Sequence, residues 1–523
     1  MLRMRIDTRA AGPLMWTGTS YRSQDGATRI TPVVNPAAEQ VAVTDQTRTL
    51  VVVRERASGT RATSAAVETV TPTVFERIRS LAVQWPLDFV AIELADSEPV
   101  QVTAGAARVT PLYLAHDAHV LAGSWDMADL AGYVRGINVR EAARLLVYRP
   151  RYSTDTFFTG IWHLTERATA YFAGHLVIRY PEPALHLRPR DLSQDAAVID
   201  AFTSTIDAVL DKRPLDPDRT LFHLTGGFDS GTIAARAAAR WPGRLTTAAL
   251  LIGGPGRGSQ IRRRTEMRAV MSYAETDILI DAMEHQPLAA DCLRTQGARI
   301  SPAEEPLHHP FTLMARATAQ SGATSVVTGL GGDEMVALSV EEYPDKKLPP
   351  ISTAADLPWI GARTRAALEF ADDGIAPPAQ INSMTLLSLE TTAPVLLREG
   401  LWPVHPFADP DMVALGEQLP YDWRMLKQLQ RQHLASHGMS DDVTHPTARE
   451  SFAEVVQHAL TTQGVTLLKE MLDEGSLLFE EKLVDPDGIT SAVHRLQSGT
   501  YGEDHDAKLL EVLTLHHATT AYC

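Results

Sequence analysis

Short apolar runs separated by polar, turn-like segments dominate the chain from residue 1 to residue 190. Such runs predict β-strands, and the clearest lie at residues 49–55, 88–95, 107–115 and 170–180. Residues 74–83 and 127–146 instead place apolar side chains at helical spacing. The pattern therefore predicts a layered domain of antiparallel sheet with some helices. Three prolines among residues 180–194 then indicate a linker.

After the linker, predicted strands alternate with predicted helices. Residues 199–210 carry one apolar stripe at helical spacing. Further strands are predicted at 221–224, 246–252, 278–280 and 324–328, and further helices at 231–241, 266–274 and 311–320. Such alternation is typical of a parallel sheet with helices on both faces, and beyond residue 360 the pattern is mainly helical. We therefore expect an α/β protein with domains at residues 1–190 and 191–523.

Composition narrows the functional classes. The formal net charge of −16 disfavours broad nucleic-acid binding, because an acidic surface repels a phosphate backbone. No apolar run approaches the length of a membrane span, and the amino-terminal residues lack the apolar centre of a signal peptide. The only cysteines, Cys292 and Cys523, give no disulfide framework or metal-binding spacing. We therefore expect a cytoplasmic protein without nucleic-acid or membrane partners.

A glycine-rich loop at residues 224–231 follows one predicted strand and opens a helix. Paired glycines let backbone N–H groups approach an anion, and the helix N-terminus adds favourable partial charge. An aspartate here would repel a bare phosphate, and a magnesium ion between Asp229 and the phosphates resolves this conflict. The predicted ATP- and pyrophosphate-binding residues of this loop are Thr225, Gly226, Gly227, Asp229 and Ser230.

A second loop, at residues 327–335, also follows a predicted strand. Gly329 and Gly331 again allow close backbone approach, and Asp333 is the predicted second magnesium ligand. A single glycine-acid loop is usually an ordinary turn, but two such loops at successive strand ends are much less expected by chance. Because ligands bind at the carboxyl ends of strands in α/β sheets, the sequence predicts one nucleotide site built from both loops.

These motifs resemble the asparagine synthetase-like family, which includes asparagine synthetase, β-lactam synthetase and the macrolactam synthetases of lasso peptides. The family's Ser-Gly-Gly-x-Asp-Ser loop is similar to residues 225–230, with Thr225 replacing the first serine, and its Gly-x-Gly-x-Asp-Glu loop is similar to residues 329–334. Residues 406–409 resemble its Pro-Phe-Leu-Asp segment, and residues 427–431 its Lys-x-x-x-Arg segment. Residues 110–114, followed by residues 121–124, resemble the end of its glutaminase-type domain.

The resemblance implies a fold and a loss of function. It implies an N-terminal degenerate Ntn-glutaminase-like αββα domain, followed by a PP-loop domain (adenine nucleotide alpha hydrolase-like) with a parallel sheet and a helical extension. The family's glutaminase uses a cysteine nucleophile at the N-terminus, whereas this chain begins Met1-Leu2-Arg3. We therefore expect no glutamine hydrolysis, so that the amine comes from a substrate or from free ammonia.

Two departures from the family pattern concern charge and proton handling. The family's Arg-x-Lys-x-x-Phe segment corresponds to residues 447–452, where Arg449 takes the place of the catalytic lysine. Arginine can stabilise an anion but cannot exchange protons at neutral pH. Leu330 stands where some lactam-forming members carry a tyrosine. The general base stays open, and for the nearby His405 and Glu399 a structural role is the simpler expectation.

The resemblance implies an AMP-forming carbon–nitrogen ligase that uses ATP and Mg²⁺. The phosphates would bind the first loop, Asp229 and Asp333 would hold magnesium, and Lys427 and Arg431 would add positive charge. Leu250 would offer backbone groups to the adenine edge. A substrate carboxylate would displace pyrophosphate, and an amine would then take the acyl group from AMP.

The amide product is open at this stage. A peptide macrolactam, as in lasso-peptide maturation, is the leading expectation, and a leader-binding protein and a protease are implied as partners. Lactam closure or ligation of small molecules is the alternative. A PP-loop enzyme that adenylates a tRNA base and a non-catalytic nucleotide-binding scaffold are further alternatives from other classes.

Overall fold

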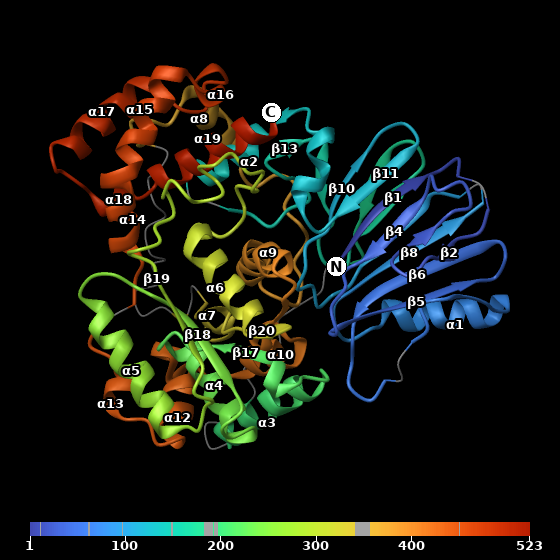
Figure 1. Cartoon of the computed structure of the whole chain (residues 1–523), viewed down its shortest axis with the longest axis horizontal. Helices are drawn as coiled ribbons and strands as arrows, with labels where there is room; N and C mark the ends of the chain where they lie inside the picture. Colours follow the sequence, from blue (N-terminus) through green and yellow to red (C-terminus); the bar gives the residue numbers. More distant parts are fainter. Residues whose placement is uncertain are drawn as a thin grey trace.

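The computed structural model describes residues 1–10, 12–60, 63–96, 98–147, 150–182, 192, 197–339, 342, 356–448 and 450–523. Two mainly antiparallel sheets occupy one side of the molecule, and a parallel sheet with its helices occupies the other (Figure 1). No helix within the described residues is long and apolar enough to cross a membrane.

The first antiparallel sheet has seven strands. Their spatial order is β14 (Ile161–His163), β10 (Tyr113–His116), β11 (Val120–Ser124), β1 (Leu2–Asp7), β4 (Arg29–Pro32), β3 (Tyr21–Arg22) and β2 (Met15–Trp16). The strand predicted at 107–115 is wrong for residues 107–112. Pro111 has no N–H to donate to a strand partner, and the N–H groups of Val109 and Thr110 donate to the Asp88 carboxylate instead.

The second sheet also has seven strands, which run antiparallel except for one parallel pair at its edge. Their order is β16 (Leu176–Arg179), β15 (Thr169–Phe172), β9 (Val100–Ala104), β8 (Phe89–Ala95), β6 (Arg48–Glu55), β5 (Ala38–Thr44) and β7 (Val67–Thr69). Alternate side chains of β6 face opposite ways, as strand geometry requires. Val51 and Val53 join the core shared with the first sheet, whereas Leu50 and Val52 pack with α1 (Pro72–Val83).

The single helical pattern predicted at 127–146 divides into three elements: the 3-10 helix η1 (Met127–Tyr133), strand β12 (Gly136–Ile137) and helix α2 (Val139–Leu146). β12 pairs with β13 (Phe158–Thr159). Gly136 has φ 149°, which a continuous helix does not allow, and the Asn138 side chain caps a new helix by accepting from Arg140 N and Glu141 N. The apolar spacing was visible in the sequence, but the break depends on these two residues.

A five-stranded sheet forms the centre of the second half, and all its neighbouring strands run parallel. Its order is β19 (Asp277–Asp281), β18 (Thr246–Leu251), β17 (Thr220–His223), β20 (Ser325–Val327) and β21 (Trp402–Val404). The predicted parallel sheet is therefore confirmed. β21 lies in the region predicted to be mainly helical, because its three residues include Pro403 and give too short a pattern to be recognised.

Helices cover both faces of this sheet. The face that contributes Phe222 and Val327 packs against α3 (Val198–Asp211), α4 (Phe228–Arg240), α10 (Pro410–Gln418) and α12 (Gln428–Ser436). The other face packs against α6 (His308–Gln320) and α9 (Ser383–Arg398). Helix α5 runs from Gly256 to Val270, whereas a helix was predicted at 266–274. Its buried residues include Arg263 and Arg264 and are mostly polar, so the buried face of α5 has no clear apolar periodicity.

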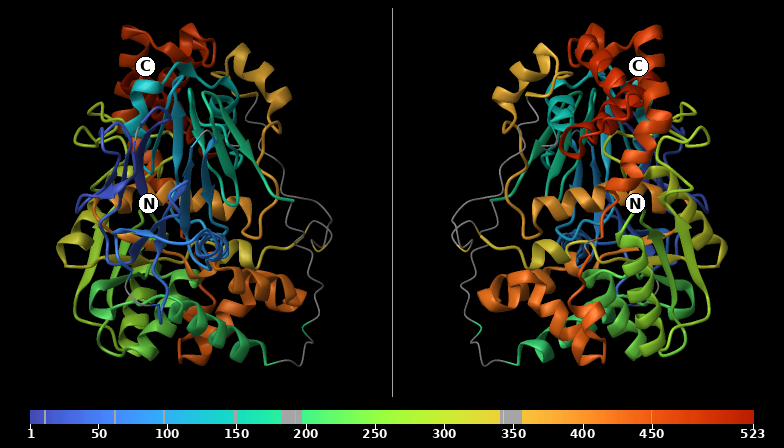
Figure 2. Two further views of the ribbon diagram at one scale, coloured as in Figure 1. Left: turned by 90° about the vertical axis from the view of Figure 1, so that its right-hand side faces the viewer. Right: turned by 90° about the vertical axis from the view of Figure 1, so that its left-hand side faces the viewer.

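The remaining helices are mostly short. They are η2 (Pro217–Arg219), α7 (Gly332–Met335), α8 (Ala362–Ala367), η5 (Leu368–Phe370), η6 (Pro406–Ala408), α11 (Tyr421–Arg424), η7 (Met425–Lys427), α13 (Asp441–Thr444), α14 (Ala453–Ala459), the π-helix η8 (Leu460–Gly464), α15 (Val465–Glu474), α16 (Leu477–Glu480), α17 (Pro486–Gln497), α18 (Glu503–Asp506) and α19 (Leu509–Tyr522). The last helices of the chain, α15 to α19, lie at the opposite end of the molecule from α3 and α4 (Figures 1 and 2). They share a core with α2, which precedes the predicted linker in the sequence.

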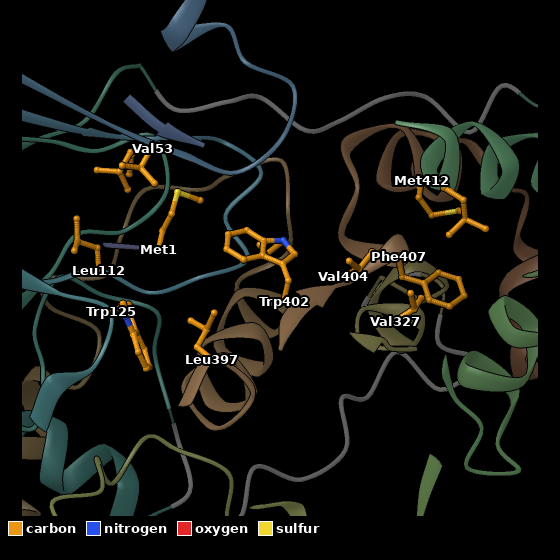
Figure 3. Close-up of a cluster of buried hydrophobic side chains, with 14 of the residues drawn as sticks. Met1, Val53, Leu112, Trp125, Val327, Leu397, Trp402, Val404, Phe407 and Met412 are labelled. Atoms are coloured by element: carbon orange, nitrogen blue, oxygen red, sulfur yellow. The ribbon is translucent and has the colours of Figure 1, made fainter. Parts of the chain in front are cut away.

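One hydrophobic core joins the antiparallel sheets to the parallel sheet. Met1 and Val53 belong to the first part, Val404 and Phe407 to the second, and Trp402 lies between them (Figure 3). The predicted division at residue 190 falls outside the described residues and stays a prediction. The continuous core nevertheless fixes the two antiparallel sheets against the edge of the parallel sheet.

Candidate functional site

Two glycine-rich loops meet at the carboxyl ends of neighbouring strands. The first follows β17 and opens α4, and the second follows β20, which pairs with β17. A side-chain carbon added at Gly329 would lie 2.5 Å from the Ser230 nitrogen, and one added at Gly332 would lie 2.5 Å from the Asp229 carboxylate. Both distances are shorter than van der Waals contact, so this approach requires glycine. The two loops therefore form one site.

Hydroxyl groups hold the first loop in an open conformation. Thr225 N donates to Ser230 Oγ at 3.1 Å, Gly227 N donates to Thr225 Oγ1 at 3.2 Å, and the two hydroxyl oxygens are 2.9 Å apart. Gly226 has φ 93°, a conformation that favours glycine. Within the described residues, no side chain caps the first turn of α4. Its N–H groups can therefore receive an anion.

Lys427 connects the acidic residues of the two loops. Its Nζ lies 2.6 Å from Asp229 Oδ2 and 2.6 Å from Asp333 Oδ1. Burial raises the pKa of Asp229 to about 6, although Lys427 opposes this shift. Burial lowers the pKa of Lys427, but the two carboxylates outweigh it and hold that pKa above its usual value. The site therefore brings the acidic side chains of both loops onto one ammonium group.

The backbone that presents Lys427 is strained. Leu426 and Lys427 have φ values of 51° and 56°, in the left-handed region that side chains other than glycine rarely adopt. Each such residue costs on the order of 1–3 kcal/mol and persists only where surrounding contacts fix it. One such contact is Arg431, whose Nε donates to the Leu426 carbonyl at 2.6 Å. Leu426 itself is 72% exposed, so the strain does not serve apolar burial and points to function.

Two further residues of α12 support the site. Gln430 Nε2 donates to Asp229 Oδ1 at 3.3 Å and to the Gly332 carbonyl at 3.2 Å, so it joins the two loops. The Arg431 guanidinium lies 4.5 Å from the centroid of the Phe228 ring and also donates to the Thr444 carbonyl. Gln430 was not recognised from sequence, because a glutamine in a helix carries no distinctive pattern.

Arg263 and Glu450 form a partly buried ion pair against the first loop and were also missed by the sequence analysis. Arg263 Nε donates to the Gly226 carbonyl at 3.0 Å, and Glu450 oxygens lie 3.2 Å from the positions of side-chain carbons added at Gly226 and Gly227. Burial raises the pKa of Glu450, with Arg263 acting in the opposite direction. An acidic group therefore lies where a phosphate would approach the loop, with a buried cation behind it.

These residues surround a cavity of about 810 Å³. Its described lining includes Thr225, Gly226, Gly227, Asp229, Ser230, Gly329, Gly331, Asp333, Lys427 and Arg431, together with Arg263 and Glu450. The structure thus brings together most of the residues predicted from the sequence to bind ATP, pyrophosphate or magnesium. Their contribution to binding stays a prediction.

Two predicted site residues stand apart. Leu250 is not among the described lining residues, and its carbonyl accepts a hydrogen bond of 3.0 Å from Gln260 Nε2. Gln260 Oε1 also accepts from Ile252 N at 3.0 Å, so this side chain already occupies the strand edge predicted for adenine. Arg449 lies outside the described residues, although its neighbours Ala448 and Glu450 line the cavity.

The two possible bases considered from sequence have structural partners. His405 is buried, and its Nδ1 lies 2.7 Å from Thr328 Oγ1 beneath the second loop. Burial lowers the pKa of His405 to about 3, with the positive charge of Arg213 adding to the shift. Glu399 lies 3.4 Å from Arg316. Neither is among the described lining residues of the cavity, which agrees with the structural role expected for both.

The acidic residues present fit a magnesium ion that is shared with phosphates. Asp229 and Asp333 already converge on one cationic group, the Lys427 ammonium. Magnesium at nucleotide sites is commonly held by one or two carboxylates, with phosphate oxygens and water completing the octahedron. The described residues contain no cluster of three or more histidine, cysteine or acidic side chains able to hold a metal. The donor set therefore suits a metal that arrives with its nucleotide.

Comparison with known proteins agrees with the position of these loops. A family model described as asparagine synthase matches residues 218–520, which include both loops and Lys427. Among curated proteins, no sequence matches the chain. One solved structure found is the U34-tRNA thiolase NcsA from Methanococcus maripaludis with its [4Fe-4S] cluster. It is 12% identical, covers 60% of this chain and 84% of its own, and has a TM-score of 0.25, too low for any structural argument.

Proposed function

The chain belongs to the asparagine synthase family, and from this premise we propose that it is an ATP-dependent ligase that makes an amide bond through an acyl-adenylate. One observation carries the proposal: Lys427 joins the aspartates of two glycine-rich loops at the edge of an 810 Å³ cavity. Fixed charges in such a site stabilise charge that develops on a leaving group, which is commonly the largest contribution to catalysis.

Each group of residues has one task in the proposed reaction. The open turn of residues 225–230 receives the ATP phosphates, and Lys427 and Arg431 place positive charge beside them. Asp229 and Asp333 would hold magnesium, which lowers the charge on pyrophosphate and makes it a better leaving group. A carboxylate oxygen forms a bond to the α-phosphorus as the bond to pyrophosphate breaks. An amine then bonds to the acyl carbon, and AMP leaves.

We further propose that the part of the chain before the linker is a structural scaffold derived from a glutaminase-type domain. Neither cysteine of the chain lies there, since Cys292 and Cys523 both belong to the second half. The two seven-stranded sheets share a continuous core with the parallel sheet, and helix α1 packs on the other face of the second sheet. A scaffold of this kind needs no nucleophile, so the amine would come from a substrate or from free ammonia.

For the product, we propose a peptide macrolactam, with a leader-binding protein and a protease as partners. The family resemblance and the missing glutaminase nucleophile support this choice. Ligation of small molecules is the alternative, and it is favoured by the limited size of a second cavity of about 440 Å³ beside the first, within the range of small-molecule sites. A screen over peptides and metabolites separates the two products.

The decisive experiment is carboxylate-dependent exchange of labelled pyrophosphate into ATP, screened over peptides and amino acids. The proposal expects exchange with at least one carboxylate, and loss of this exchange in Asp229→Asn. Asp207→Asn is the matched control. Like Asp229, Asp207 is part-buried and paired with a basic side chain, here Arg236, but it lies on α3 outside the cavity lining. Full exchange in Asp229→Asn would disprove the assigned site. ATP binding without cleavage, in the presence of every carboxylate, would favour the non-catalytic scaffold.

A further inference from the structure

A histidine that no family motif includes lines the nucleotide cavity. His223 is the last residue of β17, is partly exposed and belongs to the cavity wall. No group of the described residues forms a hydrogen bond with its imidazole, whose ring meets the edge of Phe311 at 6.2 Å between centroids. The neighbouring His405 is instead hydrogen-bonded to Thr328. The His223 imidazole is therefore available to a ligand in the cavity.

Strand geometry determines the direction of the His223 side chain. Leu221 packs with Phe311 in the core beneath α6 and α9, whereas Phe222 packs in the core beneath α4 and α12 (Figure 1). Because alternate side chains of a strand face the same side, His223 faces the same side as Leu221. Its contact with Phe311 of α6 agrees with this direction. His223 therefore lies on the α6–α9 side of the sheet.

The groups predicted to hold the phosphates lie on the other side. The loop at residues 225–230 opens α4, and Lys427 and Arg431 lie at the start of α12 and within it. In phosphoryl transfer the attacking and leaving oxygens are roughly in line through the phosphorus. Pyrophosphate on the α4 side therefore places the attacking carboxylate, with its acyl carbon, towards the α6–α9 side. His223 and Ser388 of α9 line the cavity there.

Other ionisable groups of the lining are mostly engaged with one another. The two predicted magnesium ligands are paired with Lys427, and Glu450 is paired with Arg263. Glu334 of α7 is a second possible proton acceptor of the described lining. Imidazole is the stronger base of the two in solution, with a pKa of about 6.5 against about 4.3 for a glutamate. His223 is therefore the better candidate for accepting a proton, and Glu334 is the comparison to test.

The charge state of His223 suits a proton acceptor. Burial lowers its pKa to about 4, and Arg264 of α5 adds to the shift, so the ring is uncharged at neutral pH. The other titratable groups nearby are His405, which follows β21, and Glu334 across the cavity. Negative phosphate groups in the cavity would favour the protonated ring and raise its pKa. Binding of the nucleotide would thus bring this base closer to the neutral range in which general bases work best.

We propose that His223 is the general base of amide formation, a catalytic role that rests on the ligase function proposed above. The amine nitrogen forms a bond to the acyl carbon, and a proton of this nitrogen passes to the uncharged imidazole. The bond between the acyl carbon and the AMP oxygen breaks, and AMP leaves with that electron pair. The imidazolium then returns its proton to water, which leaves the amide, AMP and an uncharged His223.

The first test needs no substrate other than MgATP. Carbon-13 signals of the histidine rings in the full-length protein are followed from pH 8 to pH 5, with and without MgATP, and His223→Gln assigns the signal of His223. We expect His223 to stay uncharged without nucleotide and to take up a proton within this range when MgATP is bound. His517 of α19 is the internal control, because burial lowers its pKa to about 4 as well, but it lies outside the cavity lining. A His223 titration that MgATP leaves unchanged would overturn the proposal.

The second test separates the two half-reactions in His223→Gln. The carboxylate identified by pyrophosphate exchange is supplied with MgATP and hydroxylamine, a weakly basic nucleophile that captures acyl-adenylates without catalysis. In parallel it is supplied with its own amine, or with methylamine where it carries none. We expect exchange and hydroxamate formation within threefold of the wild type, but amide formation lower by about 10²–10⁴-fold. His517→Gln is the matched control and should retain all three activities.

Each other outcome has a definite meaning. Amide formation within threefold of the wild type in His223→Gln would overturn the role of His223, as would a selective loss of amide formation in Glu334→Gln alone. An equal loss of exchange and amide formation in His223→Gln, with an unchanged melting temperature, would assign His223 to adenylation and also overturn it. Hydroxamate without any amide in the wild type would have the same consequence. No exchange with any carboxylate would refute the ligase itself, and the base with it.

Discussion

The close approach of Gly332 to Asp229 gives the sharpest test of the site. An added side-chain carbon at Gly332 would lie 2.5 Å from the Asp229 carboxylate, whereas ordinary contact begins at 3.4 Å. Gly332 opens α7 and does not have a positive φ, so alanine is acceptable to the backbone. The effect of Gly332→Ala therefore comes from displacement of the carboxylate by about 1 Å, and not from backbone strain.

A displacement of this size has a calculable effect. Misplacement of a catalytic group by about 1 Å can cost about 100-fold in rate, and crowding a packed site costs about 1–3 kcal/mol of stability. We therefore expect Gly332→Ala to remain folded, to bind MgATP more weakly and to lose about 100-fold in carboxylate-dependent pyrophosphate exchange. Calorimetry with MgATP gives a readout even before the acyl substrate is known.

Gly258→Ala is the matched control for this substitution. Gly258 lies in helix α5, where an added side-chain carbon would meet nothing closer than 3.7 Å. Because alanine is favoured over glycine in helices by about 1 kcal/mol, we expect slightly higher stability and unchanged activity. Gly332→Ala with MgATP affinity and exchange within twofold of the wild type would refute the reasoning, since Asp229 would then not need its observed position.

Three other substitutions test the charges and the packing of the site. Lys427→Met should lower pyrophosphate exchange by about 10²–10³-fold, because it removes a preorganised cation, and unchanged exchange would contradict its assignment. Glu450→Gln should tighten MgATP binding by up to about tenfold, which corresponds to about 1.4 kcal/mol. The reason is that it removes a negative charge beside the loop and leaves Arg263 in place. Weaker MgATP binding in calorimetry would contradict this expectation. The third substitution is His405→Asn. Between pH 8 and pH 5, the unfolding free energy of the wild type, measured by urea denaturation, should fall by about 2 kcal/mol more than that of this variant. The His405 pKa is lowered to about 3 in the folded protein, so only the unfolded chain takes up this proton as the pH falls below about 6.5, and equal pH dependence would refute the claim.

The sequence by itself determined the features that depend on local pattern. Alternating strands and helices after residue 197 predicted the parallel sheet, and the two glycine-acid loops predicted a site at the carboxyl ends of β17 and β20. These inferences succeed because apolar periodicity and glycine spacing act over a few residues. The break of the 127–146 pattern and strand β21 escaped them, since a short element leaves too few residues for a period to appear.

Only the tertiary structure decided which distant side chains meet. The pairing of Arg263 with Glu450 and the hydrogen bonds of Gln430 to Asp229 and Gly332 join segments far apart in sequence. No local pattern marks such residues, because their neighbours are set by the packing of whole elements. The same packing imposes the left-handed backbone of Lys427, whose unfavourable conformation is fixed by contacts that the sequence order does not reveal.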